Sequence, residues 1–263
     1  MIWTKGVTAV KIVTFNLRVR WDNDGINSFI HRVGLIYEKI SEQQPDIVAF
    51  QEVKPRHLEL LEKLMPEYLF VGHGGSESYG GEQVCTAVCR SACLLCGFEV
   101  FWLGPEPHVP GSRFEGQSKH PRTCLFAHIR HRESGRMLRV YNTHLDHQSS
   151  QAALRGMECV LKRIGEDAAR VGDVVLLGDF NEVPDGAALA RCKAHQSPRL
   201  LDMSEYIPYT YHGFGTKDAF LKIDYIFASE GLLDSVRRVE TWEDQKNGIY
   251  LSDHYPICAV LDI

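Results

Sequence analysis

Three absences in the sequence narrow the classes of protein that it can encode. No apolar run is long enough to span a bilayer, so we expect no membrane-spanning helix and no membrane partner. No linker rich in proline, glycine and serine and no block of like charges interrupts the 263 residues, so we expect one domain over residues 1–263. The segment Met1–Val10 lacks the basic start and apolar core of an export signal, which favours a soluble, cytoplasmic protein.

An excess of basic residues is also missing. The chain has 29 Lys and Arg against 34 Asp and Glu, a net charge of -5. Proteins that hold duplex nucleic acid through many phosphates are usually basic, so the composition argues against that class. It still allows a local basic patch at the entrance of a binding site.

Paired Cys-x-x-Cys knuckles are absent, although eight cysteines are present. Four of them, Cys85, Cys89, Cys93 and Cys96, lie close together, which leaves a zinc or iron–sulfur site as one interpretation. The neighbouring residues are apolar, and cysteine packs in such places as a small hydrophobe. We therefore expect reduced thiols in buried strands.

Two stretches of the chain share one pattern: a strand ending in a polar residue, a helix, and a second strand ending in an acid. In the first, residues 10–16 end at Asn16, a helix follows Ser28, and the strand after Pro45 delivers Glu52. In the second, a strand ends at His144, a helix covers about residues 149–169, and an apolar run ends at Asp179. Each stretch predicts a parallel crossover unit, and ligands bind at the carboxyl ends of such strands.

Further elements follow from apolar periodicity and turn residues. We expect a helix from Pro55, a short helix at 185–194, a hairpin of strands 123–130 and 136–142, and strands over 84–90, 98–103, 218–228 and 255–262. In Gly178-Asp179-Phe180-Asn181, an extended backbone would point Asp179 and Asn181 the same way while Phe180 turns into the core.

The polar residues at these strand ends suit a hydrolytic metal centre. Mg²⁺ or Mn²⁺ prefers hard oxygen ligands, and Glu52 and Asp253 supply them. His254 titrates near neutral pH and is suited to accept a proton from an attacking water. Asp224 lies in an apolar strand, where an unpaired carboxylate is costly, so it needs a partner such as this histidine.

Six ordered motifs resemble those of the endonuclease/exonuclease/phosphatase superfamily over nearly the whole chain, from Lys11 to Leu261. They are Thr14-Phe15-Asn16, Gln51-Glu52, Asn142-Thr143-His144-Leu145, Gly178-Asp179-Phe180-Asn181, Ile223-Asp224-Tyr225 and Ser252-Asp253-His254-Tyr255-Pro256. The resemblance implies a four-layer α/β sandwich, in which two packed central mixed β-sheets are flanked by helices, with the active site at their common edge. It also implies a metal-dependent phosphoesterase that hydrolyses a phosphomonoester or phosphodiester by direct attack of water.

The resemblance also implies a role for each motif residue. Glu52 would hold the cation with help from Asn16 and Asp253, while Asp179 and Asn181 would position the water and the phosphoryl group. His144 would hydrogen-bond the phosphate, and His254 paired with Asp224 would be the base, with Asp179 as the other candidate for that role. The number of metal ions stays open. The listed roles cover the residues Asn16, Glu52, His144, Asp179, Asn181, Asp224, Asp253 and His254.

Other segments are similar to small bacterial members of the superfamily. Arg122 is a candidate second phosphate contact, because a guanidinium binds phosphate oxygens as a fork. His212 and Phe214 are candidates for the pocket wall. The chain has Asp146 and His147 where nocturnin-like deadenylases have Lys-Ala after the phosphate-binding histidine, which counts against binding of a polynucleotide tail.

The sequence leaves three functional readings. The first is a phosphoesterase acting on a small or single-stranded phosphate ester. The second is a sequence-nonspecific or single-strand nuclease, in which Trp21, Trp102 or Phe114 could stack on bases. The third is an inactive binding module on the same scaffold, which would need a broken motif, and no motif is broken. The oligomeric state stays open.

Overall fold

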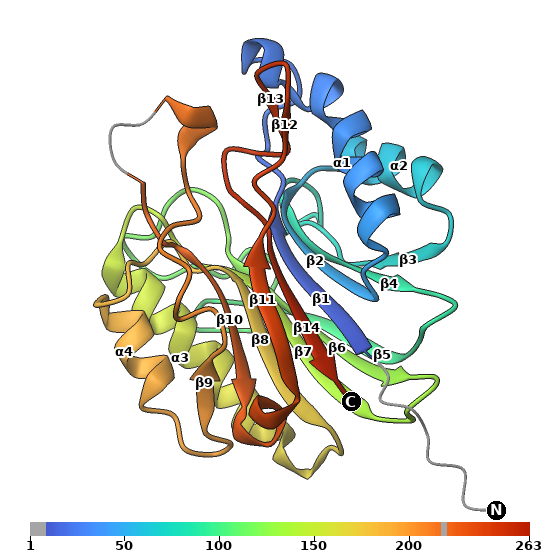
Figure 1. Cartoon of the computed structure of the whole chain (residues 1–263). Helices are drawn as coiled ribbons and strands as arrows, with labels where there is room; N and C mark the ends of the chain where they lie inside the picture. Colours follow the sequence, from blue (N-terminus) through green and yellow to red (C-terminus); the bar gives the residue numbers. More distant parts are fainter. Residues whose placement is uncertain (1–8, 217–219) are drawn as a thin grey trace, which may run out of the picture.

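The computed structural model of the protein describes residues 9–216 and 220–263. Its helices and strands, labelled in Figure 1, are β1 (Ala9–Asn16), α1 (Phe29–Gln43), β2 (Ile47–Val53), α2 (Pro55–Leu64), β3 (Tyr68–Val71), β4 (Gln83–Cys89), β5 (Cys93–Trp102), β6 (Thr123–His131), β7 (Met137–His144), α3 (Ser150–Glu166), β8 (Asp173–Asp179), α4 (Ala187–Lys193), β9 (Leu200–Asp202), β10 (Asp224–Ser229), β11 (Val236–Thr241), β12 (Gln245–Lys246), β13 (Ile249–Tyr250) and β14 (Ile257–Asp262). None of the helices in these ranges is long and apolar enough to cross a membrane.

Two six-stranded mixed sheets form the centre of the molecule. The first has the strand order β11-β14-β1-β2-β4-β3 and the second has the order β5-β6-β7-β8-β10-β9. Strands β1 and β2 are parallel, and so are β7 and β8, which confirms both predicted crossover units. Their registers place Asn16 beside Gln51 and His144 beside Asp179, so each pair of polar strand ends lies at the same sheet edge.

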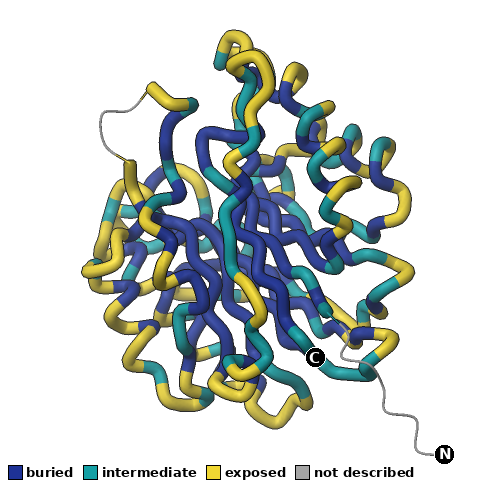
Figure 2. Tube along the Cα trace, viewed as in Figure 1, coloured by how far each residue is buried: buried dark blue, intermediate teal, exposed yellow. Residues whose placement is uncertain are grey.

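The sheets pack face to face, and helices cover their outer faces (Figure 1). On β1, Ile12 belongs to the core between the sheets, whereas Val13 belongs to the core shared with α1 and α2. On β8, Val175 faces the central core and Leu176 faces the core shared with α3 and α4. Successive strand residues point to opposite faces, so the nearly continuous apolar runs fill a core on each side. The result is the expected four-layer α/β sandwich, with buried strands inside and exposed helix faces outside (Figure 2).

A buried polar contact joins the two sheets beneath the site. Gln51 of β2 donates through Nε2 to Asn142 Oδ1 of β7 at 2.8 Å, and neither residue is exposed. The Asn142 amide in turn donates to the carbonyls of Phe50 and Cys85, at 3.1 Å each. Because an unsatisfied buried polar group costs about 1–3 kcal/mol, this network favours one register of the sheets over sliding alternatives.

The strand predicted over residues 218–228 is too long. Residues 217–219 lie outside the described part of the chain, and the strand itself begins only at Asp224. Before it, Leu221 forms an isolated antiparallel bridge with Tyr211. The short strands β3 and β9 were not predicted, because a strand of three or four residues offers too little alternation to recognise. Strand β11 was also missed, because four of its six residues are polar and none is buried.

The cysteine cluster is only partly buried. Cys85 in β4 and Cys93 in β5 are buried, as predicted, whereas Cys89 is half-buried and Cys96 is exposed. The prediction is wrong for Cys96 because β5 is an edge strand whose pairing with β6 is irregular between Leu95 and Gly97. Burial raises the pKa of the Cys85 thiol to about 12, so that thiol stays protonated.

Candidate active site

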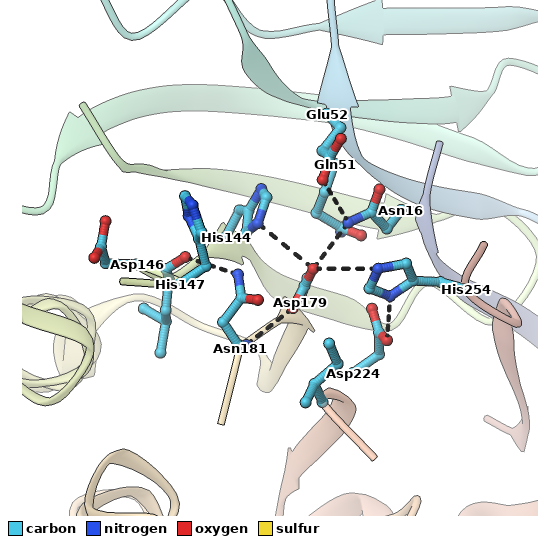
Figure 3. Close-up of polar contacts among 12 residues, drawn as sticks. Asn16, Gln51, Glu52, His144, Asp146, His147, Asp179, Asn181, Asp224 and His254 are labelled. Atoms are coloured by element: carbon cyan, nitrogen blue, oxygen red, sulfur yellow. Dashed lines mark hydrogen bonds and ion pairs between the residues drawn. The ribbon is translucent and has the colours of Figure 1, made fainter. Parts of the chain in front are cut away.

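Asp179, the last residue of β8, lies at the centre of the site (Figure 3). Its Oδ2 accepts a hydrogen bond from Asn16 Nδ2 at 2.8 Å, and its Oδ1 accepts one from the Asn181 amide at 2.9 Å. His144 Nε2 and His254 Nε2 lie 3.5 and 3.9 Å from Oδ2. The Asp179 carboxylate, only 1% exposed, therefore has polar side chains of both sheets around it.

A histidine and a second carboxylate complete one side of this arrangement. Asp224 pairs with Asp179 in the register of β10 and β8, and His254 Nδ1 donates to Asp224 Oδ2 at 2.8 Å. The predicted partner of Asp224 is thus in place. The hydrogen bond fixes the ring so that Nε2 faces Asp179.

Burial shapes the proton affinity of these groups. Burial first, and then the negative charge of Asp224, raise the pKa of Asp179 to about 7. Burial alone would lower the pKa of His254, but the charge and hydrogen bond of Asp224 and the charge of Asp179 raise it well above the ordinary value. A proton released beside Asp179 can therefore be retained on this pair of side chains.

Glu52 approaches from the other sheet on a distorted backbone. The pairing of β2 with β4 is irregular between Phe50 and Val53, and Glu52 has φ +60°. A left-handed conformation costs an L-residue about 1–2 kcal/mol, and such bulges re-aim a side chain next to a site. Glu52 Oε2 accepts from the Val19 amide at 2.6 Å, and Oε1 accepts from Asn16 Nδ2 at 3.2 Å.

The carboxylates at this end fit a hard divalent cation. Glu52 is half-buried with lone pairs left over, and Arg18 Nη1 lies 3.4 Å from Asp253 Oδ2, so the region already balances concentrated negative charge. Asn16 hydrogen-bonds the carboxylates around it, and its role as a cation ligand stays a prediction. Its amide nitrogen faces Glu52 and Asp179, while its oxygen accepts the Arg18 amide at 2.8 Å, so here it supports the carboxylates.

Asp179, Asp224 and His254 form a second possible cation site, because one ligand atom from each lies within 4.8 Å of the others. The hydrogen bond from His254 Nδ1 to Asp224 leaves Nε2 as the only ring nitrogen that could hold a cation or accept a proton. Because a cation on Nε2 would occupy the nitrogen that faces Asp179, the Glu52 end of the site suits a cation better.

Arg122 determines which nitrogen of His144 carries the proton. Arg122 Nη1 donates to His144 Nδ1 at 3.0 Å, and because a guanidinium can only donate, Nδ1 accepts and Nε2 carries the hydrogen. That N–H points toward Asp179. Burial, and then the positive charge of Arg122, lower the pKa of His144 well below its ordinary value, so the ring is a neutral donor.

The remaining donors of Arg122 are largely engaged by protein groups. Nη1 also donates to Glu82 Oε1 at 3.1 Å, and Nη2 donates to His147 Nδ1 at 2.8 Å. Within the described residues, only its Nε has no hydrogen-bond partner, with Asp146 Oδ2 at 4.0 Å. The predicted contact of Arg122 with phosphate stays a prediction, while its contact with His144 is direct.

The extended backbone predicted for Asp179 to Asn181 is wrong, although both side chains lie at the site (Figure 3). The strand ends at Asp179, and Asn181 has φ +49°. This turn lets the backbone N–H of Asn181 donate to Asp179 Oδ1, while the side-chain Nδ2 of Asn181 donates to the Leu145 carbonyl at 3.1 Å. Phe180 is buried as predicted and stacks on Tyr225 at 5.3 Å between ring centroids.

His212 and Phe214 lie near the segment Ser252-Asp253-His254, which we call the His254 corner. His212 is fully buried and stacks on Tyr255 at 3.9 Å, and its backbone amide donates to the Asp253 carbonyl at 2.9 Å. Phe214 is half-buried, with φ +58° and the guanidinium of Arg32 5.7 Å from its ring centroid. Both residues support the corner, and their contact with substrate stays a prediction.

Three residues near the site were not identified as functional from the sequence. Arg18 follows Asn16 by two positions, and this spacing was a usable signal. Glu82 lies in a glycine-rich loop, and His147 follows a motif without belonging to it. Neither has a periodic pattern that would place it beside Arg122.

Comparisons with known proteins find the same fold in several solved structures. An endonuclease/exonuclease/phosphatase from Bacteroides vulgatus is 25% identical, with a TM-score of 0.89 and coverage of 97% of this chain and 99% of that chain. A mannosyl-6-phosphatase from Bacteroides thetaiotaomicron is 22% identical, with a TM-score of 0.81 and coverage of 95% and 98%. D. rerio TDP2, complexed with a single-strand DNA product, is 20% identical, with a TM-score of 0.76 and coverage of 97% and 100%.

No curated protein sequence matches the chain. A sequence profile, however, matches residues 13–254, which extend from β1 to His254 and include every motif residue of the site, and on this match the chain belongs to the Endonuclease/Exonuclease/phosphatase family.

Proposed function

We propose that the protein is a divalent-metal-dependent phosphoesterase that hydrolyses a small phosphate ester by direct attack of water. The family includes phosphatases and nucleases, which supports a hydrolase. The observation that carries the proposal is the convergence of Asn16, His144 and His254 on the buried Asp179 carboxylate. A buried acid surrounded by donors and by a carboxylate-bound histidine is suited to orient a water and take its proton.

In this proposal the side chains of the site divide the tasks. Asp179 and Asn181 orient the attacking water, and its proton passes to the group formed by Asp179, Asp224 and His254, either onto Asp179, whose pKa is about 7, or onto Nε2 of a neutral His254. The neutral His144 donates from Nε2 to a phosphoryl oxygen as charge develops there. The new oxygen–phosphorus bond forms as the bond to the alcohol oxygen breaks, and the departing alcohol oxygen takes up a proton from solvent.

A divalent cation, Mg²⁺ or Mn²⁺, would bind at Glu52 and Asp253 and would supply charge neutralisation for the phosphoryl oxygens. Both carboxylates lie at the ends of segments that already approach one another through Arg18, whose charge acts on each of them. Asn16 then serves to hold Glu52 and Asp179 in place.

A single-strand nuclease is the second candidate, because the fold is shared with a protein whose structure contains a single-strand DNA product. The two candidates differ in salt dependence. Polynucleotide binding releases counterions and weakens steeply with added salt, whereas turnover of a small ester responds mildly.

The test is a substrate panel assayed with Mg²⁺, with Mn²⁺ and with EDTA. It covers sugar phosphates, nucleotides, inositol phosphates, lipid phosphodiesters and single- and double-stranded DNA. We expect turnover that needs the added metal and is lost in His254→Gln. Equal turnover in EDTA, or no turnover on any member of the panel, contradicts the proposal.

A further inference from the structure

A cavity of about 820 Å³ opens beside the candidate active site. Its walls include Val19, whose amide holds Glu52 Oε2 at 2.6 Å, and Glu82, which accepts from Arg122 at 3.1 Å. Two of its lining residues therefore contact active-site side chains directly. A phosphate ester seated against Asp179 has room for its alcohol portion here, since pockets for small ligands usually measure about 300–1,000 Å³.

The lining of this cavity is richer in cations than the protein as a whole. Three cations, Arg20, Lys54 and Arg56, line it, against the two acids Asp22 and Glu82. Neither Lys54 nor Arg56 has a carboxylate oxygen within 4.0 Å among the described residues. A chain with a net charge of -5 thus places unpaired cations around one hollow.

Arg20 is also poorly neutralised. Its nearest carboxylate oxygen belongs to Asp24 at 3.9 Å, and the same carboxylate is held by Arg18 Nε at 3.0 Å. An ion pair at that distance on an exposed side chain contributes little to stability. The guanidinium of Arg20 therefore remains available to a ligand.

The pKa of a histidine in the cavity wall is lowered by burial and by several nearby cations. His120 lines the cavity, and after burial the positive charges of Arg122, Lys119 and Lys54 lower its pKa. Several cations thus act together on one point of the wall. The start of α2 at Pro55 adds the partial positive charge of a helix N-terminus beside Lys54.

The cavity also has an aromatic wall. Trp21 is half-exposed and stacks on the buried His57 at 5.5 Å between ring centroids, with an interplanar angle of 22°. This packing fixes the indole within the lining. An apolar wall beside unpaired cations suits a carbon skeleton that carries an anion.

We infer that this cavity binds a second anionic group, a phosphate or a carboxylate, on the alcohol portion of the ester substrate. The inference rests on the proposed function and narrows it to small esters with two anionic ends. The first phosphate would lie at Asp179 and His144, and the second anion would lie among Lys54, Arg56 and Arg20. Charge-assisted hydrogen bonds to an anion contribute about 1.5–3 kcal/mol, which corresponds to a preference of about 10- to 100-fold over a neutral analogue.

The experiment compares three substrates that share one six-carbon chain. Glucitol 6-phosphate has a neutral far end, 6-phosphogluconate has a carboxylate there, and glucitol 1,6-bisphosphate has a second phosphate. We expect kcat/KM of the wild-type enzyme to be about 10- to 100-fold higher for at least one doubly anionic substrate. Equal values for all three overturn the inference.

Substitution then assigns the preference to the cavity. In Lys54→Gln/Arg56→Gln the ratio of kcat/KM between doubly and singly anionic substrates should fall toward one. Arg191→Gln/Lys193→Gln on α4 removes the same charge from two exposed positions and should leave the ratio unchanged. An unchanged ratio in the first variant overturns the inference, and so does a loss confined to cleavage of a single-stranded oligonucleotide.

Direct binding separates this inference from the proposed function. Titration calorimetry in EDTA with glucitol 1,6-bisphosphate measures affinity without turnover. Binding that is weakened by Lys54→Gln/Arg56→Gln supports the cavity even if no ester is hydrolysed. Catalysis without any preference for the second anion supports the proposed function and overturns the cavity.

Discussion

The two crossover units of the molecule are built alike, but the acids at their ends have different surroundings. In each, a parallel pair of strands delivers an acid to the common edge: Glu52 from β2 and Asp179 from β8. Glu52 lies in a bulge near the end of β2, with φ +60°, and is half-buried, whereas Asp179 ends a regular strand and is 1% exposed. A carboxylate near solvent can exchange water for a cation, and one enclosed by donors can aim a water. In the proposed function, the same supersecondary unit therefore serves two tasks, and the burial of the acid at its end decides which.

The strongest way to break this comparison is Asp179→Asn. Removing the central charge should lower kcat by about 10³–10⁴-fold, because water orientation and proton transfer are both lost. Steady-state kinetics on the best substrate of the panel measure the effect. Glu182→Gln, three residues further along the same segment, is the matched control, and it should retain activity within a few-fold. A loss of less than tenfold in Asp179→Asn would assign the central role to another group.

Glu52→Gln should break the other half of the comparison. It keeps the shape of the side chain and removes a cation ligand, so we expect activity to fall about 10²–10³-fold at low metal concentration and to recover partly at high concentration. The increase in thermal stability that Mg²⁺ gives the wild type should shrink as well, because binding to the native state stabilises it. Exposed Glu59→Gln on α2 is the control. An unchanged metal dependence in Glu52→Gln would contradict the assignment.

A smaller effect is expected from Arg122→Met, which tests how the second unit holds His144. Loss of the guanidinium frees His144 Nδ1 and permits the other tautomer, so kcat should fall about 10- to 100-fold with little change in KM. A direct phosphate contact would instead raise KM. Nitrogen NMR of labelled histidine measures the tautomer itself. A rise in KM with an unchanged His144 tautomer would favour the phosphate contact.

The sequence predicted the framework of this comparison more fully than its details. Asn16, Glu52, His144 and Asp179 stand where apolar runs stop, and such positions fall at strand ends by the geometry of parallel sheets. The approach of these residues to one another follows from the crossover units, whose strand pairing is confirmed. Their catalytic roles remain predictions.

What could not be predicted depends on contacts between distant segments. The φ of +49° at Asn181 arises where the chain leaves β8, and no pattern in the local sequence predicts it. Glu82 meets Arg122 only because two loops from different sheets are brought together by the packing of those sheets. The exposure of Cys96 follows from the position of β5 at a sheet edge, which is set by the strand order of the second sheet.

The smallest expected effect concerns Glu82, which lies where the two units meet. Burial, and then the charge of Glu52, raise the pKa of Glu82 from 4.5 to about 7. The folded protein therefore holds an extra proton between about pH 4.5 and pH 7. This contribution to stability is complete at low pH and is lost as pH rises through 7. Glu82→Gln cannot ionise, so it should be more stable than the wild type at pH 8 by about 1–3 kcal/mol, with the difference vanishing near pH 4.

Urea denaturation in EDTA at both pH values measures this difference without interference from a bound cation. Exposed Glu77→Gln in the same loop is the matched control and should show no such dependence on pH. If Glu82→Gln were less stable than the wild type at pH 8, the hydrogen bond from Arg122 would outweigh the cost of burying the charge. Glu82 would then behave as an ion-pair partner of Arg122. Asp179 alone would then contrast with the half-buried Glu52 as an acid whose burial raises its pKa.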